Sequence, residues 1–375
     1  MRATLADPAL TRYAGRFVWL ELDYDKPVNQ PFLRHYAVSF TPTLLVVDAA
    51  TQQALVSNAG GLSIAQLERF LEAGEGRFRG TDHGADSLLA QASVITASGQ
   101  TDAAVAQASR ALAMAGPSWP ARAHAYRVLT WGLMKGNRTQ ACAETAAAAA
   151  PTLPRGEDFG AVVLVGLQSS GAGNADWARR ASATLTPLAE EAVGIGSVIR
   201  DHRFQLYQAL MSAADAKGDS VRMRHWGHRW LDDIEAIRPR DDDERSALDI
   251  ARVDAAGELN EPNRVLPALI ASERAMPGNY NASLRLAQML EAAKRYEEAL
   301  AACDRGIAHA TGPLGKSWLL RTRADVLDDR RDPAGARAAL VQAIEVAKGI
   351  GEPGLRASNV NRLTRTLEAY DRRPH

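Results

Sequence analysis

The chain is poor in cysteine and has no excess of charge of either sign. Its 375 residues include two cysteines, Cys142 and Cys303, which lie far apart and lack C-x-x-C spacing. They therefore indicate neither a zinc site nor a disulfide framework. Lysine plus arginine and aspartate plus glutamate both number 44, which gives no electrostatic argument for nucleic acid or an anionic membrane as a partner. No apolar run approaches the roughly 20 residues that a transmembrane helix requires.

The motifs of the common enzyme classes are missing too. The sequence contains no P-loop, no G-x-G-x-x-G, no HExxH and no Ser-His-Asp arrangement, so we predict no catalytic residue, no metal and no cofactor. The N-terminal segment, MRATLADPALTRYAG, has no apolar stretch of the kind found in a signal peptide. The composition, 46% hydrophobic and 23% charged, is that of a folded protein, and the length predicts two domains or a repeat array.

Near the N-terminus, apolar segments of strand length alternate with helical ones. FVWLELD at 17–23 is a near-continuous apolar run, as expected for a buried parallel strand. Residues 26–36 carry a short helical pattern, 43–48 predict a second strand, and 55–58 can pair with it as an antiparallel edge that ends at Gly60-Gly61. Ser63 is suited to cap the next helix, whose predicted buried face comprises Ile64, Leu67, Phe70 and Leu71.

This region resembles the C-terminal two-thirds of a thioredoxin domain. The likeness runs through Tyr13-Ala14-Gly15, the run at 17–23, Tyr36-Ala37-Val38, the strand at 44–47 and the segment 60–71. It implies that Pro42, with Thr41 before it, is the cis-proline that thioredoxins place opposite their redox cysteines. We predict a partial thioredoxin-like domain over residues 1–76, followed by a linker over 77–84.

The redox cysteines of that family have no counterpart in this chain. The resemblance places the C-x-x-C just upstream of Met1, so Met1 is either internal to a longer gene or begins a domain that has lost its first strand and redox turn. We favour the longer gene, because losing a central strand would leave 17–23 and 43–48 with an unpaired edge. Within the chain as given, this region has no thiol for disulfide exchange.

Residues 85–350 repeat one pattern, a turn followed by a helix that carries a small or apolar anchor near its start. The anchors are spaced by 37, 37, 45, 42, 34 and 37 residues. The pattern resembles an irregular tetratricopeptide array of about seven helical hairpins, in which small residues let crossing helices approach closely. Residues 354–371 are typical of the polar-faced helix that caps such arrays. The anchors are Ala104, Ala141, Ala178, Met223, Val265, Ala299 and Ala336.

Several residues that could suggest a site have simpler explanations. Cys142 and Cys303 fall on predicted helices and are expected to be small buried hydrophobes rather than reactive thiols. His225, His228 and Asp232 are spaced to face a metal, but neighbouring arginines favour an ion-paired or solvated helix face. The acidic run 241–244 is expected to begin a helix, where carboxylates complement the dipole.

Aromatic residues and groove positions bear on how the array would bind a partner. We predict that most tryptophans pack between hairpins and that Trp119 and Trp318, near helix starts, edge the groove. Tetratricopeptide domains that clamp a C-terminal carboxylate use Lys, Asn and Arg at fixed positions. The matching positions here carry other residues, so a carboxylate clamp is not expected. They are Leu89, Ser93, Tyr126 and Thr130.

The sequence thus predicts an α/β thioredoxin-like N-terminal module joined to an all-α tetratricopeptide-like superhelix, an order that resembles bacterial chaperedoxin-type proteins. The first hypothesis is a non-catalytic interaction scaffold, which holds a protein or peptide partner, chaperone-like, in a groove with exposed apolar side chains. The second is a thiol-disulfide oxidoreductase whose cysteines lie upstream of Met1, and a third is an assembly factor. No nucleic-acid or membrane partner is expected, and the default compartment is the cytoplasm, or the periplasm if a signal precedes Met1.

Overall fold

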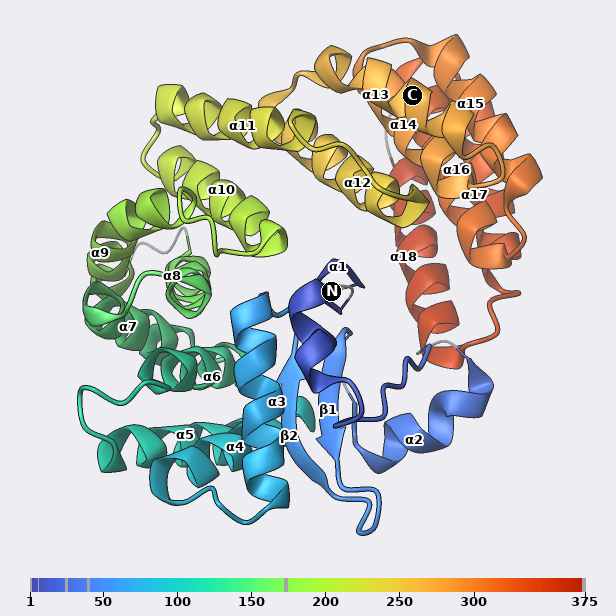
Figure 1. Ribbon diagram of the computed structural model, residues 1–375. Coiled ribbons are helices and arrows are strands. Elements are labelled where there is room, and N and C mark those ends of the chain that lie inside the picture. Colours follow the sequence, from blue (N-terminus) through green and yellow to red (C-terminus); the bar gives the residue numbers. More distant parts are fainter. Residues whose placement is uncertain (1, 6, 24–25, 39–40, 172–174, 373–375) are drawn as a thin grey trace. The chain divides into compact units, whose positions relative to one another are not determined.

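The computed structural model describes residues 2–5, 7–23, 26–38, 41–171 and 175–372, most of them in helices (Figure 1). The chain divides into two compact units, Met1–Met223 and Arg224–His375. The division falls within one helix, so the N-terminal segment shares its unit with the first helix pairs. Among the described residues, no helix combines the length and the apolar character needed to cross a bilayer.

A small sheet and one long helix organise the N-terminal part of the first unit. Strands β1 and β2 pair antiparallel, with Thr43 opposite Ala59 and Val46 opposite Val56. Ser63 caps helix α3 through a reciprocal capping box with Gln66. The second predicted strand, its antiparallel partner and the capped helix are confirmed. The elements are α1 (Arg2–Leu5), two 3-10 helices (Pro8–Tyr13 and Pro27–Asn29), α2 (Gln30–His35), β1 (Thr43–Val47), β2 (Ala54–Ala59) and α3 (Ile64–Phe78).

The prediction of a strand at residues 17–23 is wrong. Residues 18–23 form neither strand nor helix, and Val18 and Leu20 are 89% and 77% exposed, where a buried parallel strand was expected. Within the described residues the sheet consists of β1 and β2 alone, and the apolar run pairs with neither of them. A two-stranded sheet does not establish a thioredoxin-like module, and the described structure does not support that part of the predicted fold.

The rest of the chain is a succession of paired helices joined by short turns (Figure 1). In the first unit these are α4 (Gly84–Ala97), α5 (Thr101–Met114), α6 (Arg122–Lys135), α7 (Thr139–Ala149) with a 3-10 turn (Ala150–Thr152), α8 (Glu157–Ser170), α9 (Asp176–Ala192) and α10 (Arg200–Asp215). Helix α11 (Ser220–Glu235) contains the division. The second unit continues with α12 (Asp242–Leu259), α13 (Pro262–Ala275), α14 (Tyr280–Ala292), α15 (Tyr296–His309), α16 (Pro313–Asp329), α17 (Pro333–Ala347) and α18 (Pro353–Asp371).

The turns within the helix pairs share one backbone conformation. The first helix of a pair is followed by a residue with positive φ, such as Gly99 (78°), Asn137 (57°) or Lys294 (62°), which stops the helix and redirects the chain. Four or five residues later comes the predicted anchor, and Ala104 and Ala299 are fully buried there. Because every predicted anchor lies in the first turns of a second helix, the helical-hairpin array is confirmed.

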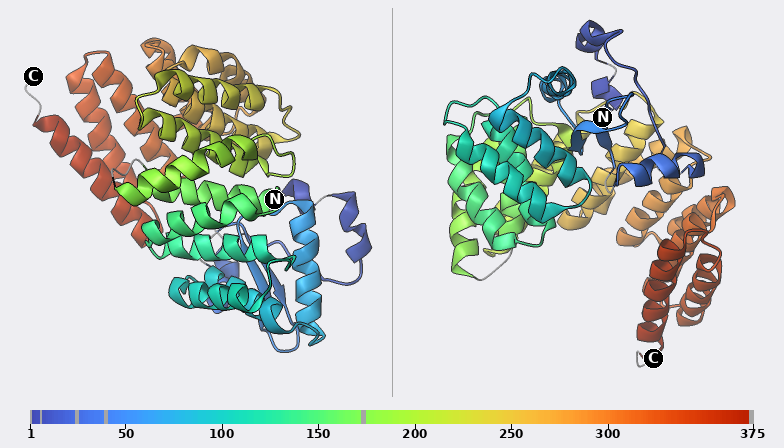
Figure 2. Two further views of the ribbon diagram at one scale, coloured as in Figure 1. Left: turned by 90° about the vertical axis from the view of Figure 1, so that its left-hand side faces the viewer. Right: turned by 90° about the horizontal axis from the view of Figure 1, so that it is seen from below.

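Contacts pass along each unit from one pair to the next. In the first unit α4, α6, α8 and α10 contact one another in succession, and α5, α7 and α9 each contact the helix that follows (Figure 2). Helix α8 is the most deeply buried, and its Gly166 lets α7 approach closely. A Cβ atom at Gly166 would lie 2.3 Å from that of Ala146. In the second unit α18 packs on α17, with Leu363 fully buried.

Candidate functional site

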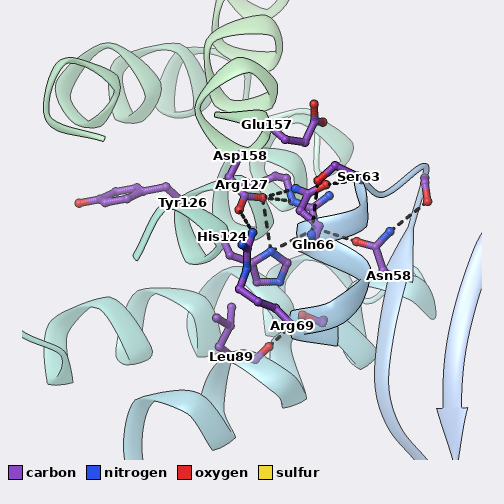
Figure 3. Close-up of polar contacts among 12 residues, drawn as sticks. Asn58, Ser63, Gln66, Arg69, Leu89, His124, Tyr126, Arg127, Glu157 and Asp158 are labelled. Atoms are coloured by element: carbon purple, nitrogen blue, oxygen red, sulfur yellow. Dashed lines mark hydrogen bonds and ion pairs between the residues drawn. The ribbon is translucent and has the colours of Figure 1, made fainter. Parts of the chain in front are cut away.

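The best-formed polar site of the first unit lies where α3 meets α6 and α8. Asp158, in the first turn of α8, is 7% exposed although α8 is otherwise almost wholly apolar. A carboxylate at this place complements the positive end of the helix dipole. Figure 3 shows side chains from α3 and α6 converging on it. We call Asp158 and the four side chains around it, Gln66, Arg69, His124 and Arg127, the polar joint.

Donors from two helices surround the carboxylate. Gln66 Nε2 donates to Asp158 Oδ1 at 2.7 Å, while Gln66 Oε1 accepts from the backbone N–H of Ser63, so one side chain serves both the helix cap and the joint. Arg69 Nη2 lies 3.2 Å from Oδ2, and Arg127 Nε lies 3.1 Å from Oδ1. Arg127 also reaches β2, where its Nη2 donates to Asn58 Oδ1 at 2.6 Å. The joint therefore ties α3 and the sheet to the helix pairs.

These contacts decide the charge states in the joint. Burial alone would raise the pKa of Asp158, but the charges of Arg127 and Arg69 outweigh it and hold that pKa well below its usual range. For His124, burial and then the charge of Arg127 lower the pKa. A neutral His124 accepts from Arg127 Nη2 through Nδ1 at 3.1 Å. The joint thus holds an ionised aspartate beside a neutral histidine.

The neighbouring carboxylate, Glu157, points away from Asp158 (Figure 3) and fastens a different element. It is 4% exposed, its Oε2 accepts from the backbone N–H of Ile199 at 2.6 Å, and its Oε1 pairs with His202 Nδ1. Two adjacent acids at the start of α8 therefore hold α3 and α6 on one side and the start of α10 on the other. With donors of the chain itself filling these positions, both carboxylates serve the structure rather than a substrate.

Exposed apolar side chains concentrate on the segment that failed to form a strand. Val18, Trp19, Leu20 and Leu22 are 89%, 47%, 77% and 37% exposed and lie within five consecutive positions. We call residues 18–22 the apolar segment. In the described helix pairs, by contrast, exposed large hydrophobic residues stand singly on different helices. They are Met114, Val221, Ile250, Val341 and Leu355. Four exposed apolar side chains thus gather near the N-terminus, while the apolar groove of the array stays a prediction.

The predicted site residues occupy ordinary structural positions. The Thr41–Pro42 peptide bond is cis. Trp119 packs against the core of the first pairs and donates from Nε1 to Asp86 Oδ1 at 2.9 Å. In the second unit, Trp318 packs near Leu284 and Leu319 and donates to Asn359 Oδ1 at 3.3 Å. Both indoles are half-buried, so their role as groove aromatics stays a prediction.

The positions at which a carboxylate clamp was discounted make local contacts. Leu89 is buried, and the hydroxyl of Ser93 donates to its carbonyl at 3.0 Å. Thr130 donates to the carbonyl of Tyr126 at 2.8 Å, and the Tyr126 ring lies beneath the guanidinium of Arg122. These side chains offer no convergent set of cations for a carboxylate.

Both thiols are buried and inert. Cys142 and Cys303 are each 0% exposed, and Cys142 lies 3.2 Å from the carbonyl oxygen of Thr130. Burial raises the pKa of Cys142 and raises that of Cys303 to about 12. The expectation that the cysteines are small buried hydrophobes is confirmed.

The acidic and histidine-containing helices also have structural roles. Asp241 caps α12 by accepting from the backbone N–H of Glu244 at 2.7 Å, as the acidic run predicted. His228 pairs with Glu261 at 2.9 Å and Asp232 with Arg264 at 2.6 Å, while the His225 ring lies against Trp226. The three side chains of the considered metal set thus engage different neighbours.

Three carboxylates lie close together on α14 and α16 of the second unit. Burial raises the pKa of Glu291 to about 7, and the charges of Asp325 and Asp329 raise it further, while Arg321 opposes them. Burial also raises the pKa of Asp325, although its carboxylate lies 3.6 Å from Arg321 Nε. This cluster is where the second unit holds like charges against one another.

Our sequence reasoning identified Ser63 but missed the polar joint. The available signal was the pair Glu157-Asp158 at the start of a helix that is otherwise nearly all apolar, since acids in such a helix require buried partners. The partners themselves gave no signal, because Gln66 lies 92 positions from Asp158.

Comparisons with known proteins add little. No family model matches the chain, and no curated protein sequence matches it. Among solved structures, the chain is similar to the TPR2AB domain–pHSP90 complex of yeast Sti1, at 12% identity and a TM-score of 0.30, covering 77% of this chain and 98% of that chain. Because a TM-score of 0.30 is too low to establish a shared fold, the helix pairs themselves carry the description of this protein.

Proposed function

We propose that the protein is a non-catalytic interaction scaffold that binds extended or unfolded polypeptide through the apolar segment, in the manner of a chaperone. The observation that carries the proposal is the exposure of four large apolar side chains within residues 18–22. Large apolar side chains exposed together in this way often mark an interaction site. The helix pairs supply the frame on which this segment is displayed.

The form of the segment favours an extended partner. The side chains stand on an irregular stretch of backbone, with Leu22 at the edge of an open hollow, so they select for apolar character more than for shape. Covering Val18 and Leu20 would contribute roughly 3–6 kcal/mol before the costs of association. A contribution of this size offsets only part of those costs, so we expect binding to be weak and reversible.

No observation favours a second function. Thiol-disulfide exchange needs an accessible thiolate, whereas Cys142 and Cys303 are buried and their pKa values are raised. The polar joint has an aspartate and a histidine, but Asp158 is engaged by Gln66 and the arginines. We therefore make no proposal for an enzymatic activity.

The test is suppression of aggregation by the full chain. Heat-denatured citrate synthase serves as the client, light scattering follows its aggregation, and a fluorescent hydrophobic dye reports exposed apolar surface. The wild type should lower scattering, and the double variant Val18→Asp/Leu20→Asp should lose most of this effect and most of the dye signal. Both side chains are exposed, so the fold should survive the change.

A matched control separates the apolar segment from general surface charge. The variant Ile250→Asp/Val341→Asp replaces two exposed apolar residues that stand singly on α12 and α17. It should protect the client as the wild type does. Equal protection by the Val18→Asp/Leu20→Asp variant, or none by the wild type, would refute the proposal.

A further inference from the structure

An open cavity of about 220 Å³ lies between α9 and α10 of the first unit, which contact each other (Figure 1). Its walls are two facing helical stripes in which small residues predominate. An engineered apolar cavity of about 150 Å³ is large enough to bind benzene, so this one has room for an aliphatic side chain. The stripes are formed by Ala183, Thr186 and Pro187 on α9 and by Leu210, Ala213 and Ala214 on α10.

The space adjoins a position that varies along the repeat. Thr186 lies eight residues after the anchor Ala178, and the same position holds a leucine or an isoleucine in four of the other six hairpins and Ala149 or Glu273 in the remaining two. In α15 that residue is Ile307, which packs against Leu319 of the following helix. Threonine at this position is shorter and leaves part of the corresponding volume unfilled. The four aliphatic residues are Leu112, Leu231, Ile307 and Ile344.

The polar atoms of the walls leave the cavity largely apolar. The Thr186 hydroxyl donates to the carbonyl of Ser182 at 2.7 Å on its own helix, so it needs no partner in the cavity. Pro187 lies inside α9 and adds its apolar ring to the wall.

Among the described residues, the rim carries two acids and two cations, and one of the cations has no charged partner. Glu190 pairs with the Arg222 guanidinium, and the Asp219 carboxylate accepts from the backbone N–H of Arg222. The Lys217 ammonium lines the same rim and, within the described part of the chain, makes no hydrogen bond or ion pair. An anionic group on a ligand would complement it.

We propose that this cavity binds a leucine or isoleucine side chain of a partner polypeptide whose next residue places a carboxylate at Lys217. The bound side chain occupies the volume that the repeat elsewhere fills from within. The choice of a polypeptide as occupant rests on the proposed function, but the site is distinct from the apolar segment. Each site can therefore fail its test without the other.

The experiment uses short peptides and the full chain with isotope-labelled alanine methyl groups, so that Ala213 and Ala214 report binding by NMR. Acetyl-Gly-Leu-Asp-amide should shift these methyl signals. Acetyl-Gly-Ala-Asp-amide should bind roughly tenfold more weakly, because most of the apolar area is lost. Acetyl-Gly-Leu-Asn-amide should bind about threefold more weakly, as expected for one exposed ion pair.

Variants that fill the cavity or change Lys217 test whether these features bind the peptide. Thr186→Ile restores the residue type of the sister hairpins and should abolish the shifts, with Ala213→Leu as a second filling variant if the first does not fold. Lys217→Met should remove the preference for the Asp peptide over the Asn peptide, and Lys217→Arg should keep it. The Val18→Asp/Leu20→Asp variant should bind these peptides normally. Wild-type protein without methyl shifts, or a folded filling variant that binds as the wild type does, overturns the proposal.

Discussion

Asp158 in the first unit and Glu291 in the second are both carboxylates withdrawn from water, and the two units treat them in opposite ways. Asp158 accepts from Gln66 and is paired with Arg69 and Arg127, and its pKa is held below the usual range. The side chain of Glu291 makes no hydrogen bond or ion pair within the described residues, faces Asp325 and Asp329, and has its pKa raised to about 7.

The difference shows that burial alone does not set the charge of an acid. For both groups burial disfavours the ionised form, but only at Asp158 do donors outweigh it. Asp158 therefore acts as a fixed negative charge on which distant elements are assembled. At Glu291, burial and the neighbouring carboxylates both oppose the ionised form, so this group releases its proton near neutral pH.

Breaking the joint should give the largest effect. Asp158→Asn removes the charge that compensates Arg127, whose side chain is only 11% exposed, and we expect a loss of about 3–5 kcal/mol in the first unit. Hydrogen exchange along α3 is the measurement, because two compact units make a single global free energy of unfolding ill-defined. Unchanged protection of α3 in the variant would mean that the joint does not hold this helix.

The pH dependence of the joint has a definite sign. The folded pKa of Asp158 lies below its ordinary value of 3.8, so its contribution is fully present above that value. It is lost as the pH falls through the folded pKa.

Replacing Glu291 with an uncharged residue should have a smaller effect on stability, and of the opposite sign. Its ordinary pKa is 4.5 and the folded value is about 7, so between these values the folded state holds a proton that the unfolded state has released. Stability of the wild type therefore falls as the pH rises through this window. Glu291→Gln should be more stable by roughly 1–2 kcal/mol at about pH 8, after discounting the solvent-exposed part of the side chain.

Hydrogen exchange along α14 in wild type and Glu291→Gln across this pH range is the measurement, because it reports on the second unit by itself. The difference in protection, corrected for the intrinsic exchange rate at each pH, should shrink as the pH falls and vanish near the ordinary glutamate pKa. A constant difference across the range would show that Glu291 does not titrate there.

The array was predictable from the sequence because its signals are local. A turn residue able to adopt positive φ, such as Gly99 or Asn137, precedes an anchor such as Ala104 by a few positions, and both lie within one hairpin. Capping of α3 by Ser63 is local in the same way. These features are fixed by neighbours that the sequence places side by side.

The apolar segment and the polar joint were not predictable, for two physical reasons. An apolar run such as 17–23 is suited to a strand, but whether it forms one depends on pairing with a distant strand, and here it pairs with neither β1 nor β2. The joint depends on which buried donors meet Asp158, and Gln66 and Arg69 lie 92 and 89 positions away. Such pairings depend on how distant elements pack, and they produce no periodic pattern in the sequence.

An exposed ion pair completes the comparison and should give the smallest effect. Asp102 lies 3.3 Å from Arg138 Nη1, but the two side chains are 87% and 47% exposed, so water already solvates both charges. We expect Asp102→Asn to change the stability of the first unit by less than about 0.5 kcal/mol, because exposed pairs gain little over hydration. Hydrogen exchange of α5 and α7, run beside the Asp158→Asn variant, measures it. A loss comparable to that of Asp158→Asn would show that charge pairing itself, rather than burial with donors, decides stability in this unit.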